Sequence, residues 1–296
     1  MNKGRSFIVV VVLIGIAIGV AMALKGYSLY QATRANAVVY WQASDESNQQ
    51  KITHGLWQAF LSSYLSDDSR GSRTLDYQSV TKQDKQKLSD YINTLQSLDP
   101  RRYPKNEQLA YWVNLYNALV INLVLRHYPI DSIKNIGDGL TGPWNIELAT
   151  IAGKQVTLNQ IEHGILRPLW QDNRIHYVIN CASIGCPDLP PQPFSSVNIN
   201  KQLNEAAIRF INQHKAVQLA NNTLTLSSIY NWFAVDFGSS DQNIIKHIKA
   251  YALPELKSEL EHFSGTIEFD YNWKLNSTKQ VSIKAPMIKA PMTKSH

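Results

Sequence analysis

The sequence has only two cysteines among its 296 residues, and it lacks several motifs by which an activity is commonly identified. It contains no glycine-rich phosphate-binding loop, no nucleophile elbow and no paired metal-binding helix motif. The sequence signals of those enzyme classes are therefore absent, and no cofactor and no metal is expected.

Acidic residues are missing from both ends of the chain, although basic residues are common there. Lys3 and Arg5 precede residue 7, and four lysines lie from residue 279 onward. Because the formal net charge of the whole chain is +6, the residues between these ends carry no net charge. A nucleic-acid surface requires basic residues clustered on the folded part of a protein. Nucleic acid is therefore not an expected partner.

Long runs without a single charged or polar side chain are also missing, apart from residues 7–24. Such a run is near the lower limit of the roughly 17–25 residues that cross a bilayer. Lys3 and Arg5 precede it, which favours a cytoplasmic N-terminus and an exported body. Ala21-Met22-Ala23 resembles a signal-peptidase site, so a cleaved export signal is the alternative to a retained anchor.

These observations predict a single-pass protein of the inner membrane whose body lies on the periplasmic, extracytoplasmic side. Residues 1–6 would form a cytoplasmic basic end, 7–24 the membrane segment or signal peptide, and 25–50 a linker. Residues 51–276 would form one globular domain, and residues 277–296, in which the sequence KAPM occurs twice, a disordered basic tail. The expected partner through residues 7–24 is the membrane itself.

Within the body, helical and alternating patterns follow one another in an irregular order, which indicates an α+β fold with a small, mainly antiparallel sheet. Hairpins are predicted at 146–157 and 217–226, and a last strand at 266–273. Residues 106–127 are apolar on nearly every side, which is typical of a helix buried at the centre of a core.

Asn114 and Asn117 lie three residues apart on this helix and therefore share a face. A buried amide without a hydrogen bond costs about 1–3 kcal/mol. The two amides are therefore expected either to tie the helix to neighbouring backbone or to orient a catalytic or ligand-binding group.

The chemistry-bearing residues concentrate in HYVINCASIGCPDL, residues 176–189. Tyr177, Val178 and Ile179 predict a short strand. This strand would run into a turn of small residues that carries Cys181, Ser183 and Cys186. A strand that ends in a loop of reactive side chains is a common way to present a functional site.

Four stretches of the body together resemble the family known as domain of unknown function 547. They are AYWVNLYNALVINLVL at 110–125, LNQIEHGILR at 158–167, RIHYVINCASIGCPDL at 174–189 and SIYNWFAVDFG at 228–238, and DYNWKLN at 270–276 also fits. The resemblance extends over roughly residues 75–276. It implies an exported bacterial protein distantly comparable with papain-like and transglutaminase-like hydrolases. It also places six residues at positions shared by the family: Glu162, His163, His176, Cys181, Ser183 and Cys186.

One interpretation is a cysteine-dependent, peptidase-like or amidase-like hydrolase acting on a peptide or cell-envelope substrate. Cys181 would be the nucleophile and His176 or His163 its base. The other expected site residues are Glu162 and Asn117, which would orient the base, and Ser183, Cys186 and Asn114, which would contact the substrate. Two observations argue against this interpretation. The cysteines precede prolines instead of capping a long helix, and a five-residue offset places His176 and Cys181 on opposite faces of a regular strand.

The alternative is a disulfide between Cys181 and Cys186, since an exported body permits disulfides and four intervening residues can form the necessary turn. The protein would then be a non-catalytic binding or structural module of the cell envelope. A metal site formed by the same cysteines with His176 or His163 fits less well, because the spacing matches no standard zinc pattern.

Overall fold

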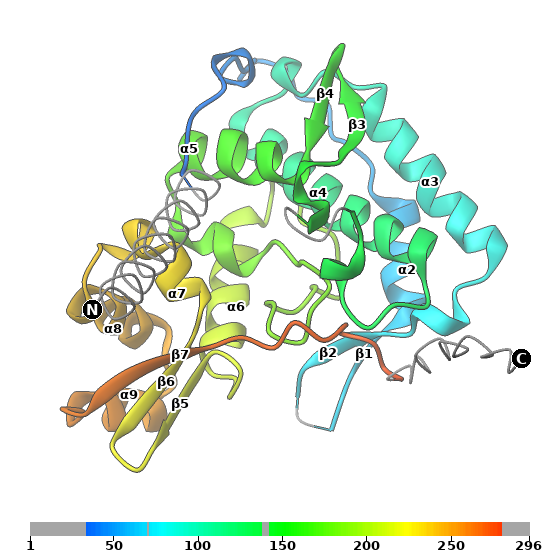
Figure 1. The fold of residues 1–296 in the computed structure, drawn as a ribbon. Coiled ribbons are helices and arrows are strands. Elements are labelled where there is room, and N and C mark those ends of the chain that lie inside the picture. Colours follow the sequence, from blue (N-terminus) through cyan, green and yellow to red (C-terminus); the bar gives the residue numbers. More distant parts are fainter. Residues whose placement is uncertain (1–33, 70, 138–141, 280–296) are drawn as a thin grey trace, which may run out of the picture.

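A computed structural model of the chain describes residues 34–69, 71–137 and 142–279. Its centre is the helix α4, Lys105–His127, around which the other helices pack (Figure 1). By length and composition, α4 is the one helix of these residues that could cross a membrane, but 94% of its most apolar window is buried in protein. The prediction of a central buried helix is confirmed. The predicted membrane segment, 7–24, and most of the predicted tail lie outside the described residues.

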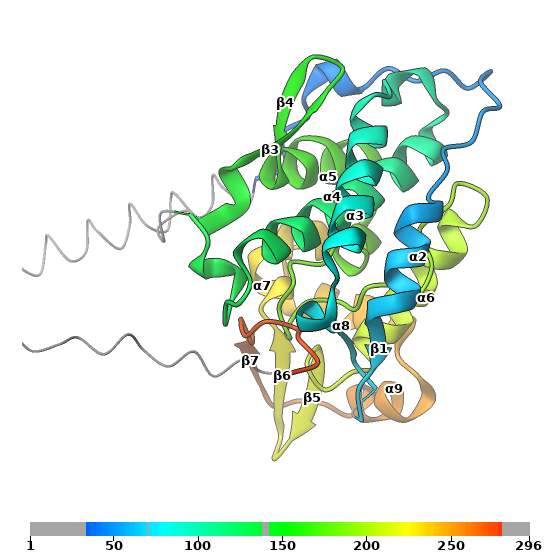
Figure 2. The ribbon, with the colours of Figure 1, turned by 90° about the vertical axis from the view of Figure 1, so that its right-hand side faces the viewer.

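Two further helices, α2 (Gly55–Tyr64) and α3 (Lys82–Gln96), pack on one side of α4 (Figure 2). The N-terminus of α3 is fixed by Thr81, whose hydroxyl oxygen accepts a hydrogen bond of 3.1 Å from the backbone N–H of Asp84. The phenol of Tyr111 on α4 donates to the carbonyl of Leu95 at 2.9 Å, which joins the two helices.

The strands form three small separate sheets instead of the single sheet that was predicted. The strands β1 (Leu65–Asp67) and β2 (Arg73–Leu75) form one antiparallel pair, and β3 (Glu147–Ile151) and β4 (Lys154–Thr157) form another. The third sheet has the order β5–β6–β7, from Val217–Ala220, Thr223–Ser227 and Thr266–Asp270. Both predicted hairpins are confirmed, but β7 pairs with β6 in parallel. A parallel pair requires a long crossover, which α8 (Asp241–Tyr251) and α9 (Pro254–Glu261) supply.

The remaining elements are short except for α6. They are η1 (Val39–Trp41), η2 (Tyr77–Ser79), η3 (Pro100–Arg102), η4 (Ile133–Asn135), η5 (Gly142–Asn145), the π-helix Gln160–Leu166, α5 (Arg167–Trp170), η7 (Asn173–Tyr177), α6 (Ile199–Ile211), α7 (Ile229–Trp232) and η8 (Ala234–Phe237).

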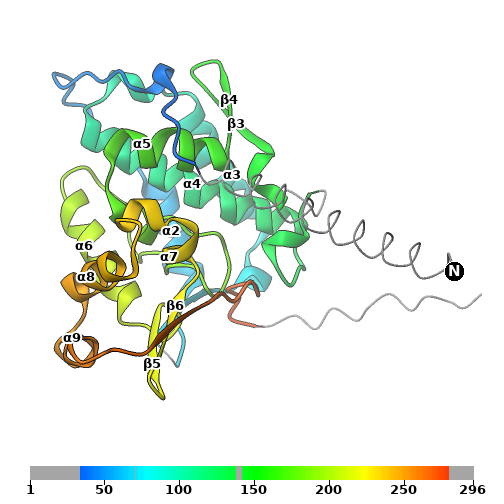
Figure 3. The same cartoon turned by 60° about the vertical axis from the view of Figure 1, so that its left-hand side comes forward.

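The buried apolar residues form two clusters, and α6 contributes to both of them. Ile199 and Leu203 belong to the large cluster around α4. Phe210 and Ile211 belong to a smaller cluster beneath α7, α8 and the sheet β5–β6–β7 (Figure 3). Tyr177 belongs to the smaller cluster and Val178 to the larger one. The segment that carries the predicted site therefore lies at the junction of the two.

The strand predicted at Tyr177–Ile179 is wrong. Residues Asn173–Tyr177 form a 3-10 helix, η7, whose N-cap Asp172 accepts from the backbone N–H of Arg174 at 2.9 Å. In the described parts of the chain, residues 178–180 pair with no strand. The amide of Asn117 takes the place of a strand by accepting from the N–H of Asn180 at 2.8 Å and donating to the carbonyl of Val178 at 2.9 Å. Because the side chain of Asn117 forms hydrogen bonds with these backbone N–H and C=O groups, the apolar and β-branched residues are stable here without a sheet.

Two segments near the ends of the described chain pack on the body. Within the segment expected to be a linker, Trp41 is buried. The N–H of Asn36 donates to the carbonyl of His163 at 2.9 Å, and the N–H of Val38 donates to the carbonyl of Gly164 at 2.9 Å. Ser277, where the tail was predicted to begin, is buried and forms a parallel bridge with Leu75. The ordered backbone therefore continues past the predicted boundary.

Candidate functional site

The two buried asparagines of α4 hold both ends of the loop that contains the cysteines. Asn117 binds the backbone of Val178 and Asn180 before the loop. Asn114 binds Phe194 after it, accepting from its N–H at 3.0 Å and donating to its carbonyl at 2.8 Å. The first of the two expected roles, tying the helix to backbone, is the one observed. Both residues position the loop.

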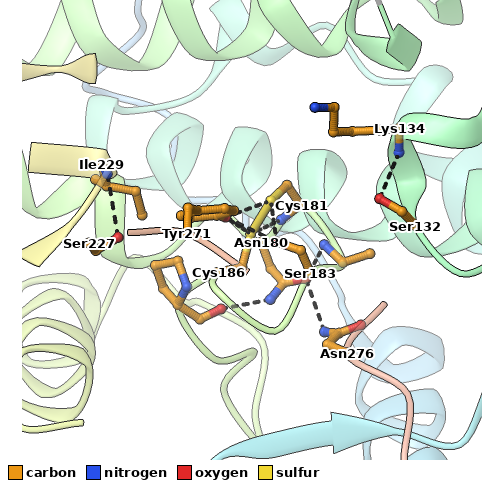
Figure 4. Close-up of a disulfide and its surroundings, with 12 residues drawn as sticks. Ser132, Lys134, Asn180, Cys181, Ser183, Cys186, Ser227, Ile229, Tyr271 and Asn276 are labelled. Carbon is orange, nitrogen blue, oxygen red and sulfur yellow. Dashed lines mark hydrogen bonds between the residues drawn. A yellow bond between two sulfur atoms is a disulfide. The ribbon is translucent and has the colours of Figure 1, made fainter. Parts of the chain in front are cut away.

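Cys181 and Cys186 form a disulfide, with 6.1 Å between their Cα atoms (Figure 4). The turn between them begins at Ala182, whose φ of 58° lies in the left-handed region. Asn180 stabilises this turn, because its side-chain oxygen accepts from the N–H of Ala182 at 2.8 Å and its amide donates to the carbonyl of Pro187 at 2.6 Å. Cys181 is half-buried, whereas Cys186 is only 3% exposed.

The phenol of Tyr271 lies against the disulfide, close to both sulfur atoms (Figure 4). It donates to the Sγ of Cys186 at 3.1 Å, and it accepts from the hydroxyl of Ser183 at 3.0 Å. The backbone N–H of Cys181 also donates to the Sγ of Cys186, at 2.8 Å. The Sγ of Cys186 therefore has a backbone donor as well as the phenol, whereas the Sγ of Cys181 lies within reach of the hydroxyls of Ser183 and Tyr271.

The segment that carries Tyr271 pairs with the disulfide loop along its backbone. The N–H of Ile184 donates to the carbonyl of Lys274 at 2.8 Å, and the N–H of Gly185 to that of Asn272 at 2.9 Å. A Cβ at Gly185 would lie 3.0 Å from the backbone nitrogen of Asn272 and 3.1 Å from the ring of Tyr271. A side chain at this position would require one of the two segments to shift by a few tenths of an ångström.

A second group of polar side chains is centred on Asp236 at the end of η8. One carboxylate oxygen of Asp236 accepts from His176 Nε2 at 2.7 Å and from Arg167 Nε at 2.6 Å. The ring of His176 stacks on Phe233, with 4.3 Å between the ring centroids. Burial lowers the pKa of His176 more strongly than the hydrogen bond to Asp236 raises it. The imidazole is thus a neutral donor that the carboxylate orients.

Arg167 extends this group to His163, since its guanidinium lies 3.0 Å from His163 Nδ1. Burial and then the Arg167 charge lower the pKa of His163 to about 3. His163 is therefore neutral near pH 7, and its proximity to Glu162 (3.8 Å) is not an ion pair. Arg167 also forms an ion pair with the carboxylate of Asp236.

Glu162 precedes His163 on the π-helix Gln160–Leu166. π-helices are rare in proteins, and those that occur are often found at functional sites. The phenol of Tyr116 donates to Glu162 Oε2 at 3.3 Å. Burial raises the pKa of Glu162 to about 7, against the lowering effect of the Arg167 charge. A carboxyl group that titrates near neutral pH in a buried position can hold or release a proton.

The predicted site residues thus separate into the disulfide group and the histidine group. Within the described residues, no hydrogen bond or ring contact joins Cys181 to His163 or His176. The link between the groups is electrostatic. Burial and then the charge of Glu162 raise the pKa of Tyr116. Burial also raises the pKa of Tyr271, the hydrogen bond from Ser183 lowers it, and the charge of Glu162 raises it.

Asn180, Tyr271 and Asp236 are among the residues of the site that were not predicted. Each lies in a stretch that carried the family resemblance. That shared pattern was the available signal, because Tyr271 lies 85 residues from Cys186 and Asp236 lies 60 from His176. No local periodicity reveals such pairings.

In the described parts of the chain, no three or more histidine, cysteine, aspartate or glutamate residues are grouped so that they could hold a metal ion. Comparison with curated proteins found no match. Comparison with solved structures found none either. Residues 100–211, which hold α4, Glu162, His163, His176 and both cysteines, match the family described as "Protein of unknown function, DUF547".

Proposed function

We propose that the protein is a binding module of the cell envelope, attached to the inner membrane through residues 7–24, with its body on the extracytoplasmic side. The observation that carries this proposal is the Cys181–Cys186 disulfide. Disulfides persist in oxidising compartments, whereas cytosolic proteins keep their thiols reduced. The uncharged run at 7–24 supports the same compartment. Protease protection of sealed membrane vesicles tests this attachment, and a protein recovered entirely as a soluble cytosolic species would contradict it.

The ligand site in this proposal is a pocket of about 380 Å³ between α6 and the loop that follows the disulfide. The loop is rich in proline, which has no N–H to donate, and side chains bind its carbonyls instead. The donors are Asn180 to Pro187, Arg73 to Leu189, Gln58 to Pro191 and Gln202 to Pro193. With the disulfide before it and Asn114 after it, this wall is held in place before any ligand arrives.

The charges around the pocket favour a ligand with a carboxylate or another anionic group. Arg73 and Arg209 both line the pocket. Burial, and then the charge of Arg209, lowers the pKa of Arg73, so the two guanidinium groups repel one another. Asp188 is already paired with Arg209 at 2.7 Å and with Lys215 at 2.6 Å. Asp67 lies 3.5 Å from Arg73 and 2.6 Å from Arg209, but its side chain is 61% exposed, so it compensates the two charges only in part. An anion bound inside the pocket beside Arg73 would add to this compensation.

The rest of the lining is half apolar and half polar. Its apolar residues are Phe194, Phe210, Pro190, Pro191 and Ala206, and its polar residues are Gln192, Asn198, Lys201, Gln202 and Glu205. Apolar contacts combined with a few polar and charged groups are typical of sites that bind small molecules and peptides. The ligand class that this pocket supports is therefore an acidic peptide or a carboxylate-bearing fragment of the cell envelope.

Replacing Arg73 by Gln should weaken the binding of a dye-labelled peptide containing two glutamates by at least tenfold, because a charged hydrogen bond in a partly buried site is lost. Fluorescence anisotropy measures this affinity. Arg126→Gln is the matched control, since Arg126 is exposed at the end of α4 and outside the pocket lining, and it should leave the affinity unchanged. Equal affinities for the glutamate peptide and its glutamine counterpart would contradict the proposal.

A cysteine-dependent hydrolase is the second candidate, and the observation that favours it is the His176–Asp236 pair. A carboxylate that orients an imidazole is a recurring feature of nucleophilic catalysis. This function would require the disulfide to be reduced first and His176 or His163 to reach Cys181. Hydrolysis of a peptide only in the presence of reductant, abolished by Cys181→Ser, would support it over the binding module.

A further inference from the structure

The two sulfur atoms of the disulfide differ in their exposure and in their hydrogen-bond partners. Cys181 is half-buried and its Sγ lies near two hydroxyl groups, those of Ser183 at 3.3 Å and Tyr271 at 3.1 Å. Cys186 is 3% exposed, and its Sγ accepts hydrogen bonds from the backbone N–H of Cys181 and from the phenol of Tyr271. An attacking thiol can therefore approach Cys181 more easily than Cys186.

The donors on Cys186 are arranged as a hydrogen-bonded chain. Ser183 donates to the oxygen of Tyr271, and Tyr271 donates to the Sγ of Cys186. Hydrogen bonds in such a chain polarise one another. Donors of this kind stabilise a thiolate more than a disulfide sulfur, because the charged form is the stronger acceptor. In thiol–disulfide exchange, a leaving thiol of lower pKa leaves faster.

Tyr271 is held in position by its neighbours and is not a mobile surface side chain. Its ring packs against Trp232 and Trp273, with centroids 4.8 Å and 4.7 Å away. The backbone of Asn272 accepts from Gly185, four residues beyond Cys181. The donor on Cys186 is therefore in place before the disulfide opens, so its stabilising effect requires no reorganisation.

We propose that the Cys181–Cys186 disulfide exchanges with a dithiol, with Cys181 as the sulfur that is attacked and Cys186 as the leaving thiolate. This is an activity beyond ligand binding, and it does not depend on the pocket. Tyr271 is the catalytic residue because it touches the reacting sulfur atoms. Ser183 is a positioning residue that orients the phenol.

The exchange balances in two steps with a dithiol of a partner protein or a small molecule as the reductant. In the first step a thiolate of the dithiol bonds to the Sγ of Cys181, the Cys181–Cys186 bond breaks, and Cys186 leaves as a thiolate stabilised by Tyr271 and the N–H of Cys181. In the second step the other thiolate of the dithiol attacks its own first sulfur and releases the Cys181 thiolate. Two electrons pass from the dithiol to the cysteine pair, and the two protons lost by the dithiol are taken up by the two thiolates from solvent.

The test measures the reduction of the oxidised full chain by dithiothreitol at pH 7, with acid quenching, alkylation and intact mass at each time point. We expect reduction at least ten times faster than that of oxidised glutathione under the same conditions. Tyr271→Phe should slow reduction at least tenfold, and Ser183→Ala several-fold. Tyr40→Phe should have no effect, because Tyr40 is also half-buried but its phenol donates to Ala152 at the turn of the β3–β4 hairpin.

A structural role for Tyr271 would produce the opposite result. A loosened fold exposes the disulfide and speeds its reduction, so slower reduction identifies the effect on the leaving thiolate.

With glutathione as a single thiol, the trapped mixed disulfide should be on Cys181. Reduction no faster than that of oxidised glutathione, an unchanged rate in both Tyr271→Phe and Ser183→Ala, or glutathione attached to Cys186 would each overturn the proposal. Arg73→Gln should leave the rate unchanged, which separates this activity from the proposed ligand site.

Discussion

The free energy of unfolding should fall by about 3 kcal/mol between pH 6.5 and pH 5, an order-of-magnitude figure that follows from proton linkage. The cause is a set of buried or half-buried histidines that stay neutral in the folded protein and become charged when it unfolds. Burial is the largest effect on each, and it lowers the pKa of His163 to about 3 and those of His54 and His247 to about 4.

The sign follows from the order of the pKa values. A histidine whose pKa is lower in the folded state than the ordinary 6.5 contributes stability above pH 6.5 and loses it as the pH falls toward its folded value. Over this window, three such residues together would lower stability by about 5 kcal/mol. Glu162 acts in the opposite direction, since its pKa is raised from 4.5 to about 7 and its folded form takes up a proton first. Proton uptake by Glu162 in the folded state raises the free energy of unfolding by about 2 kcal/mol over this window. This gain is smaller than the loss caused by the histidines.

Urea unfolding at several pH values measures this loss. His247→Gln should reduce the acid-induced loss by about 1–2 kcal/mol, because one titrating group is removed. His262→Gln is the control, since His262 is exposed at the C-terminal end of α9, and its profile should follow that of the unchanged protein. A stability that is flat from pH 6.5 to 5 would contradict the assignment of neutral buried histidines.

Replacing Trp112 by Ala should lower the free energy of unfolding by about 3–5 kcal/mol. Trp112 lies at the centre of α4 with no exposed surface, and its ring meets those of Trp41 and Tyr111 edge-on, with centroids 5.0 Å away in each case. The substitution would leave a cavity that the surrounding helices can close only in part. A loss of this size is a large part of the total stability of a typical domain.

The control for this prediction is Trp170→Ala, which removes the same side chain from a half-buried position at the end of α5. Its cost should be about 1 kcal/mol, in the range of ordinary substitutions. Equilibrium urea unfolding compares the two variants. Equal, small losses would show that α4 is not the centre of the core.

The elements that the sequence predicted correctly are those with a local cause. The helix 106–127 follows from its apolar composition, and the hairpin at 217–226 from the Asn221-Asn222 turn, where both residues adopt positive φ. The start of the π-helix also has a local signal, since Thr157 and Gln160 each bind the backbone N–H of the other.

The errors share one physical reason, which is that distant side chains replace the usual backbone partners. Asn117 occupies the place of a neighbouring strand beside Val178 and Asn180, so the predicted strand does not form. The three sheets are likewise fixed by long-range pairings, such as β7 beside β6. For the site, the sequence placed Cys181, Ser183 and Cys186 in one turn, but it gave no indication that Tyr271 would bind them.

The histidines illustrate the same limit. Glu162 and His163 are adjacent in the sequence and were expected to act with Cys181. The structure instead joins His163 to His176 through Arg167 and Asp236. Asp236 was not singled out, because nothing within a few residues of it indicates a partner that lies on η7.

The central claim is that Cys181 and Cys186 are bonded to each other in the native protein, and counting thiols tests it most directly. The protein is isolated from its own membrane fraction without reductant, denatured in the presence of N-ethylmaleimide, and weighed before and after reduction. We expect no alkylated cysteine before reduction, and a mass increase of about 2 Da on reduction alone, because one sulfur–sulfur bond takes up two hydrogens. Two alkylated cysteines in the unreduced protein would contradict the account.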